Sequence, residues 1–160
     1  MKKFMLMVIF IQSVAVGFTQ TNVMEDIISL LGDQSQNWSG FTFQPSLYGS
    51  SLYLTNNNFQ GYRIILDDEF NSSHPTNIVR VRIISEFDTI DEANTWLMPF
   101  YEFARNDNWI QVSSPSEGMD VYQRDDIFLV IEYPYYAYFA NNRPLAQVSF
   151  ATSLRDFLPP

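Results

Sequence analysis

An aromatic segment in the last third of the chain carries the side chains best suited to holding a ligand. Residues 133–139 read Tyr-Pro-Tyr-Tyr-Ala-Tyr-Phe, and two asparagines and an arginine follow closely. Aromatic faces combined with amide and guanidinium donors suit a sugar or a peptide, and tyrosine and arginine are enriched at interface hot spots. The alternative is structural, because aromatic residues favour strands and could pack beneath the following loop. The candidate ligand-binding residues are therefore Tyr133, Tyr135, Tyr136, Tyr138 and Arg143.

Side chains that could act as a nucleophile or a general base are scarce. His74 is the only histidine and lies in a Ser-Ser-His-Pro stretch between two expected strands, which favours an exposed turn residue. The chain has no cysteine, which excludes disulfides, thiolate metal sites and cysteine nucleophiles. No Gly-x-Ser-x-Gly strand elbow occurs either. The sequence therefore predicts no catalytic residue, no metal site and no cofactor.

Carboxylates gather at three places along the chain: Asp67–Glu69, residues 86–92 and Asp125–Asp126. The first and third groups fall where turns are expected, and the second surrounds an expected helix N-terminus, where negative charge is stabilising. None has the alternating aspartates and the glycine of a calcium loop. Structural roles in turns and caps are expected. Two alternatives stay open, namely a calcium site and a pair of carboxylates that cleaves a glycosidic bond.

Two helices are expected among the elements that must position these groups. The first begins at a capping box formed by Asn22 and Glu25 and ends at Gly32. The second begins at a better capping box, Thr89 and Glu92, and contains Pro99, which removes one backbone hydrogen bond. Its apolar face is formed by Ala93, Trp96, Leu97, Phe100 and Ala104.

Short strands with turn signals between them account for most of the remaining chain. The clearest one is residues 77–85, where Val79, Val81 and Ile83 should face one side and the intervening arginines the other. Asparagines at 56–58 and the Arg-Asp-Asp turn at 124–126 indicate two hairpins. Strands are expected at residues 41–43, 51–55, 61–66, 77–85, 109–113, 119–123, 127–133 and 146–152.

The two halves of the chain show the same order of elements. Asn37-Trp38 precedes Asn108-Trp109 by 71 positions, and a proline–valine pattern in the first half recurs 69 positions later, as Pro75, Val79 and Val81 against Pro144, Val148 and Phe150. The offsets of 71 and 69 agree if the two halves differ in length by two residues between these positions. The sequence predicts an internal duplication with units at 20–87 and 88–160. The fold class is α+β: two αββββ-like units form an antiparallel sheet with two helices packed on one face.

The first 19 residues have the layout of a secretory signal peptide. Lys2-Lys3 is a cationic start, the apolar run from Phe4 to Phe18 is 15 residues long, and small residues follow. A membrane-spanning helix needs roughly 20 apolar residues, so cleavage is favoured over an uncleaved anchor. Cleavage between Thr19 and Gln20 would leave a single domain at 20–160, without a transmembrane segment.

Removal of this segment changes the charge of the chain. Both lysines lie in it, so the remainder has seven arginines, 18 carboxylates and a formal net charge of −11. Such a chain repels phosphates, which excludes nucleic acid as a partner. Export together with the absence of cysteine indicates a bacterial protein, periplasmic or secreted.

These observations favour an exported, non-enzymatic binding or interaction domain, a monomer or weak homodimer whose partner is a protein or a glycan. Two alternatives belong to other classes. One is a small carboxylate-dependent hydrolase acting on an extracellular or cell-wall polymer. The other is an envelope structural protein that self-associates.

Overall fold

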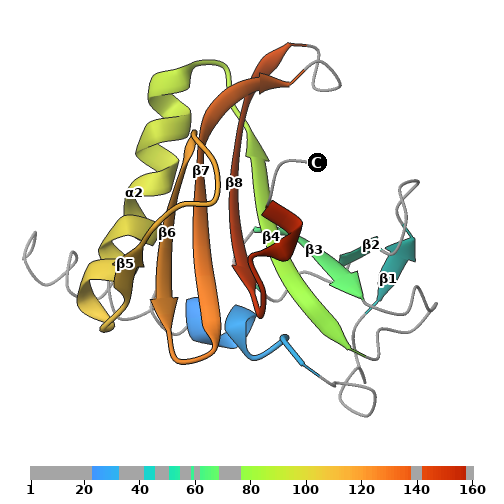
Figure 1. The fold of residues 1–160 in the computed structure, drawn as a ribbon. Coiled ribbons are helices and arrows are strands. Elements are labelled where there is room, and N and C mark those ends of the chain that lie inside the picture. The colour runs from blue at the N-terminus through green and yellow to red at the C-terminus, as the bar shows by residue number, and fades with distance from the viewer. Residues whose placement is uncertain are drawn as a thin grey trace, which may run out of the picture.

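An antiparallel sheet of eight strands dominates the computed structural model, which describes residues 23–32, 42–45, 51–54, 59, 62–68, 77–137 and 142–157 (Figure 1). A short helix at residues 23–28 precedes the strands. The other elements, in chain order, are β1 (Phe43–Pro45), β2 (Ser51–Leu54), β3 (Arg63–Asp68), β4 (Ile78–Glu86), α2 (Ile90–Asn106), β5 (Ile110–Val112), β6 (Met119–Arg124), β7 (Ile127–Ala137), β8 (Arg143–Ala151) and the 3-10 turn η2 (Arg155–Phe157). The expected α+β class is confirmed.

The strand order across the sheet is β1-β2-β3-β4-β8-β7-β6-β5, and every neighbouring pair is antiparallel. β4 and β8 are distant in sequence but meet at the centre, where Val81 lies opposite Phe150 and Ile83 opposite Val148. The sheet therefore consists of two four-strand meanders joined along one seam.

The alternation expected in β4 is observed at Val81 and Ile83, which are fully buried in the main core. It fails at Val79, because the pairing with β3 shifts register there and Ile78 takes the buried core position instead. Arg80 and Arg82 lie on the opposite side, because successive side chains of a strand point to opposite faces.

The capping box predicted for α2 is present. The Thr89 hydroxyl accepts a hydrogen bond from the Glu92 backbone N–H, and the Glu92 carboxylate accepts one from the Thr89 N–H. The helix continues past Pro99 to Asn106. Its buried side chains are Ala93, Leu97, Phe100, Phe103 and Ala104.

The main core lies between the helices and the sheet. Met24 and Ile27 of the short helix, together with Phe100 of α2, belong to the same cluster of buried side chains as Leu129 and Phe150 of the sheet. A second, smaller cluster lies on the other face and consists of Val121, Val130, Ala151 and Phe157. Figure 1 shows η2 in front of this face, which we call the helix-free face.

The short helix ends at residue 28, four residues before the stop expected at Gly32, which instead forms an isolated bridge to β4. Gly32 has a φ of 91° and exchanges two backbone hydrogen bonds with Ile78 at the start of β4. Such a φ is readily available only to glycine. The predicted cap at Asn22 lies outside the described residues.

One expectation about the carboxylates is wrong. Asp67 and Asp68 do not lie in a turn but complete β3, where both are buried. The Asp68 carboxylate accepts a hydrogen bond from the backbone N–H of Asn77. Asp67 lies in register with Arg80 of β4, so the cross-strand neighbour and not a turn accounts for its position.

Candidate functional site

A β-bulge in β7 determines where the tyrosines point. Glu132 lies opposite Gln147 of β8, but the next paired residue is Tyr135, which lies opposite Leu145. Three steps along β7 thus match two along β8, with Pro134 inside the bulge. Proline has no N–H to donate, so a bulge is one of the few places where an inner strand accepts it.

The tyrosines at this end of β7 stay largely exposed. Tyr133 is 47% exposed, Tyr135 41% and Tyr136 60%, whereas Leu129, Val130 and Ile131 earlier in the same strand are fully buried. These three make up most of the large exposed hydrophobic side chains in the described part of the chain, the others being Met98 and Ile110. β7 therefore runs from the core into an exposed aromatic end.

Tyr133 belongs to a hydrogen-bonded group centred on Asp120 of β6. The Tyr133 hydroxyl donates to Asp120 Oδ1 over 3.3 Å, and the Tyr101 hydroxyl of α2 donates to Oδ2 over 3.0 Å. Gln111 Nε2 of β5 donates to Oδ1 over 3.4 Å. The negative charge of Asp120 raises the pKa of Tyr133. Burial first, and then the bond to Asp120, raises the pKa of Tyr101. Both hydroxyls therefore stay protonated donors at neutral pH.

Tyr135 lies on the other side of the sheet from this group. Its partner Leu145 alternates with the core residue Ala146, so Tyr135 shares the helix-free face with Glu132. Burial and then the charge of Glu132 raise the pKa of the Tyr135 hydroxyl. Tyr133 and Tyr135 thus present their rings to opposite sides of the same strand end.

Arg143 lies close to these residues at the start of β8, opposite Ala137. Its guanidinium donates to Asp88 over 2.6 Å, and both side chains are well exposed, so the pair is open to exchange with a ligand. Tyr138 lies outside the described residues. The structure therefore brings Tyr133, Tyr135, Tyr136 and Arg143 to one end of the β7–β8 hairpin.

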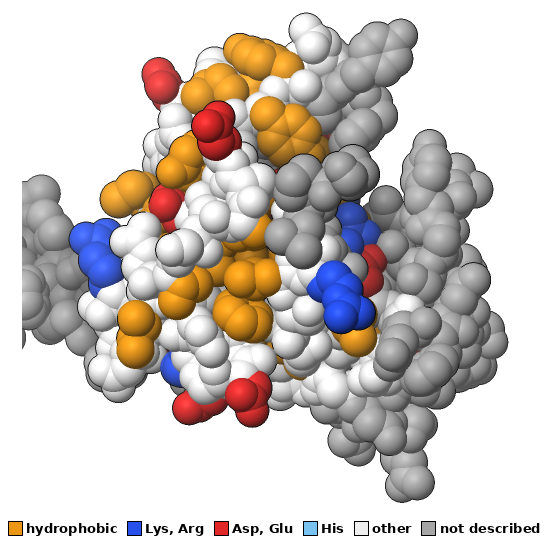
Figure 2. All heavy atoms as spheres, in the orientation of Figure 1, with side chains coloured by type: hydrophobic (Ala, Val, Ile, Leu, Met, Phe, Trp, Pro, Cys, Tyr) orange, Lys and Arg blue, Asp and Glu red, His pale blue; other side chains and the backbone are white. Residues whose placement is uncertain are grey.

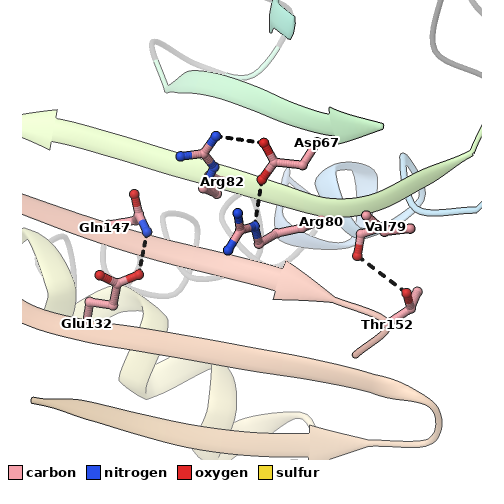
Figure 3. Close-up of polar contacts among 7 residues, drawn as sticks. All are labelled: Asp67, Val79, Arg80, Arg82, Glu132, Gln147 and Thr152. Atoms are coloured by element: carbon pink, nitrogen blue, oxygen red, sulfur yellow. Dashed lines mark hydrogen bonds and ion pairs between the residues drawn. The ribbon is translucent and has the colours of Figure 1, made fainter. Parts of the chain in front are cut away.

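A polar group on the helix-free face was not foreseen from the sequence (Figure 3). Asp67 of β3 accepts from Arg80 Nε over 2.6 Å and from an Arg82 guanidinium nitrogen over 2.7 Å. Glu132 accepts a hydrogen bond from Gln147 across the β7–β8 pair. Burial raises the pKa of Glu132, while the bond from Gln147 and the two arginines oppose that effect.

Apolar side chains gather beside this polar group. Figure 2 shows hydrophobic side chains collected over the strands of the helix-free face, with charged side chains mostly around them. Four partly buried residues pack against the small buried cluster on this face: Val112, Met119, Phe128 and Leu154.

The remaining candidate side chains either have structural roles in turns and caps or lie outside the described residues. Asp125 occupies the β6–β7 turn with a φ of 53°, and Glu92 caps α2, as expected. His74 and Glu69 lie outside the described residues. Among the residues that are described, no three acidic or histidine side chains lie close enough together to hold a metal ion.

Comparison of the chain with protein-family models, with curated proteins and with solved structures found no match. Across the described ranges, no helix has the length and apolar character needed to cross a membrane. The aromatic end of β7 offers exposed aromatic faces, hydroxyl donors, one carboxylate and one arginine.

Proposed function

We propose that the chain is a non-enzymatic binding domain that holds a protein or a glycan through the aromatic end of β7. The carrying observation is the exposure of Tyr133, Tyr135 and Tyr136, because large exposed apolar side chains gathered at one strand end are typical of an interaction site. Tyrosine presents a large rigid face together with a hydroxyl, which suits recognition at low entropic cost.

The surroundings of the tyrosines support recognition of a polar ligand. Asp120 supplies an acceptor beside the Tyr133 ring, and Arg143 supplies a donor at the start of β8, the strand paired with this end of β7. A glycan unit needs this combination, because its C–H faces pack on aromatic rings while its hydroxyls need hydrogen-bond partners. The strongly acidic chain disfavours polyanions as partners.

A glycan array probed with purified residues 20–160 tests this function. Bound glycans should lose at least about tenfold in affinity with Tyr136→Ala and with Tyr135→Ala, as expected when an interface centre is truncated. Met98→Ala is the matched control, since Met98 is comparably exposed on α2. Equal binding by wild type and both tyrosine variants would contradict the proposal.

A hydrolase remains the second candidate, because Glu132 is a half-buried carboxyl with a raised pKa beside Tyr135. Release of cleaved sugar from a bound glycan, with loss of release in Glu132→Gln, would favour the hydrolase over the binding domain.

We propose that residues 1–19 direct export to the periplasm or the medium, with cleavage between Thr19 and Gln20. Support comes from the cationic start and the short apolar run. Amine labelling of the exported protein should find one reactive amine, at the new N-terminus. Three reactive amines would show that Lys2 and Lys3 remain attached.

We infer that the two halves, 20–87 and 88–160, derive from a duplication, each being a helix followed by four strands with the helix on the same sheet face. The strand order supports this proposal, because it runs inward from each edge to the seam between β4 and β8. In related sequences, the two halves should align at the offset of 69 positions. Halves no more alike than unrelated αββββ units would contradict it.

The binding domain is proposed to be a monomer or a weak homodimer. The partly exposed residues Val112, Met119, Phe128 and Leu154 on the helix-free face support weak self-association, which is also what a structural envelope protein would need. Sedimentation at rising protein concentration tests this, and a stable higher oligomer would favour the structural role.

A further inference from the structure

The outer side of β5 is an open edge of the sheet. β5 is the last strand in the sheet order and lies beside the end of α2 (Figure 1). Its inner side pairs with β6, whereas no backbone hydrogen bond from any described residue reaches its outer side. Unpaired backbone groups at a sheet edge form a template on which another extended chain can pair.

The register of β6 determines which residue of β5 directs its backbone outward. β6 and β7 meet around a two-residue turn at the pair Arg124–Ile127, and the closing pair of such a hairpin exchanges both backbone hydrogen bonds. Because this direction alternates along an antiparallel strand, the β6 residues opposite Ile110 and Val112 direct their backbone groups to β5. The residue between these two, Gln111, therefore points its N–H and C=O away from the sheet.

β5 lacks the features that commonly protect a sheet edge, such as a charged side chain, a bulge or a proline. The opposite edge strand, β1, ends in Pro45. β5 reads Ile-Gln-Val and pairs with β6 in unbroken register. Ile110 is 70% exposed, more than any other large hydrophobic side chain that the structure describes. Because β5 has only three residues, its edge suits a short extended segment.

The side chains on one face of this edge line a hollow of about 750 Å³. Val112 packs against the small cluster on the helix-free face, and Ile110 lies two positions away on the same face. A segment antiparallel to β5 would place two side chains opposite Val112 and Ile110, where apolar β-branched residues pack best. Its next side chain on this face would lie opposite Asn108, where α2 ends.

That end of the hollow is acidic. Asp107 and Asp125 both line it, and Asp125 is exposed. Among the described lining residues Arg124 is the one cation, and it already donates to both carboxylate oxygens of Glu25. A basic side chain is therefore favoured at this position. A second copy of the chain is disfavoured, because each copy without residues 1–19 has a formal net charge of −11.

We propose that the outer edge of β5 binds a short extended segment of a cationic protein by strand addition. The segment runs antiparallel to β5 and pairs with the N–H and C=O of Gln111. Its residues opposite Val112 and Ile110 are apolar, and a basic residue two positions after the latter lies near Asp125. The site uses none of the tyrosines of β7, so it is independent of the function proposed above.

The experiment titrates the purified protein with the peptide acetyl-Thr-Val-Thr-Val-Thr-Arg-Thr-amide and follows amide hydrogen exchange by NMR. The Gln111 N–H is open to solvent in the free protein, so its exchange should slow at least about tenfold at saturating peptide. The N–H groups of Ile110 and Val112 point to β6 and should change less. This pattern distinguishes strand addition from binding through side chains alone.

Two matched peptides test the assigned contacts. Replacement of the arginine by glutamate should weaken binding at least about tenfold, because it places a like charge beside Asp125. N-methylation of the central threonine removes the N–H that pairs with the Gln111 carbonyl, and it should also weaken binding at least about fivefold. Added salt should weaken binding of the arginine peptide, since exposed charges are screened.

Variants of the protein test the same contacts from the other side. Gln111→Pro removes the outward N–H at an edge position where proline is tolerated, and binding should fall at least about fivefold. Gln111→Ala removes the same side chain but keeps this N–H, so it should bind the peptide as wild type does. Asp125→Asn should weaken binding, whereas Asp126→Asn makes the same charge change at an exposed residue outside the hollow lining.

Ile110→Lys is a further variant, which introduces a typical edge-protecting charge at an exposed position and should weaken binding even if Gln111→Pro fails to fold. Unchanged binding in Ile110→Lys would overturn the proposal, as would no added protection of the Gln111 N–H. Equal binding of the arginine and glutamate peptides would overturn it too. Protection that grows with protein concentration without peptide, together with a dimer in sedimentation, would assign the edge to a second copy instead.

Discussion

Glu25 and Arg124 lie 99 positions apart in the chain and meet in an ion pair with two hydrogen bonds. The same guanidinium lies over Trp109, which follows the C-terminal end of α2. One arginine therefore joins the short helix, the end of α2 and the β6–β7 hairpin. A planar guanidinium is suited to this arrangement, because it binds a carboxylate at its edge and an aromatic ring at its face.

Glu25→Gln should lower the free energy of unfolding by about 1 kcal/mol. Paired hydrogen bonds strengthen the ion pair, but Glu25 is 43% exposed, and solvent screens part of the attraction. Urea unfolding followed by tryptophan fluorescence measures the change. Asp88→Asn breaks the more exposed pair with Arg143 and should cost less than about 0.5 kcal/mol. Equal losses of unfolding free energy in the two variants would show that the Glu25–Arg124 pair is no stronger than the exposed Asp88–Arg143 pair.

Thr89→Ala should destabilise the protein by about 1 kcal/mol, because it leaves the Glu92 backbone N–H without its cap. Thr89→Ser keeps the hydroxyl and should stay close to wild type. Thr95→Ala is the internal control, since the Thr95 hydroxyl donates to the Asp91 carbonyl inside the helix, where alanine is favoured. Thermal unfolding in which Thr89→Ala and Thr95→Ala lose the same stability would argue against the cap.

Pro99→Ala should raise the free energy of unfolding by about 1–3 kcal/mol. Proline inside a helix removes one backbone hydrogen bond and crowds the preceding turn. Denaturant unfolding measures the gain, and Met98→Ala on the adjacent exposed position should change stability by less than about 0.5 kcal/mol. A less stable Pro99→Ala protein would mean that the packing of the half-buried ring outweighs its cost to the backbone.

Glu132→Gln should stabilise the protein at pH 7 and lose that advantage in acid. Burial raises the pKa of Glu132 in the folded state above its unfolded value of 4.5, so folding favours the protonated form. The contribution of this carboxyl to stability is thus fully present below the unfolded pKa and is lost as pH rises through the higher folded pKa. A neutral glutamine removes this dependence while still contacting Gln147.

Urea midpoints of wild type and Glu132→Gln, measured from pH 4 to pH 8, test this prediction. The difference should grow with pH and level off near neutrality. Glu102→Gln, on the exposed surface of α2, should show no such trend. A difference that is constant with pH would rule out titration of Glu132 as its cause.

Features set by neighbouring residues were predictable from the sequence. The Thr89–Glu92 box, the hairpin around Asp125 and the alternation of Val81 with Arg82 each depend on a few adjacent positions. Local propensity and side-chain period therefore sufficed for most elements.

Features that depend on register were not predictable. The partnership of Asp67 with Arg80 requires the alignment of β3 with β4, and a turn was expected there instead. Tyr133 and Tyr135 would share a face in a regular strand, but the bulge at Pro134 separates them. A hollow lined by Asp107, Ile110 and Gln123 joins segments from the end of α2, from β5 and from β6, and nothing local in the sequence marks it.

The seam between β4 and β8 can form only after β8 has been synthesised. β4 is complete at Glu86, but its second edge finds a partner only in β8, which ends at Ala151. Until β8 is available, β4 is the unpaired edge strand of the first four strands. Its core residues Val81 and Ile83 then lie at that open edge. The closing step joins residues far apart in sequence, so it should be slow, and chains in which β4 but not yet β8 has been synthesised should be the most prone to aggregation.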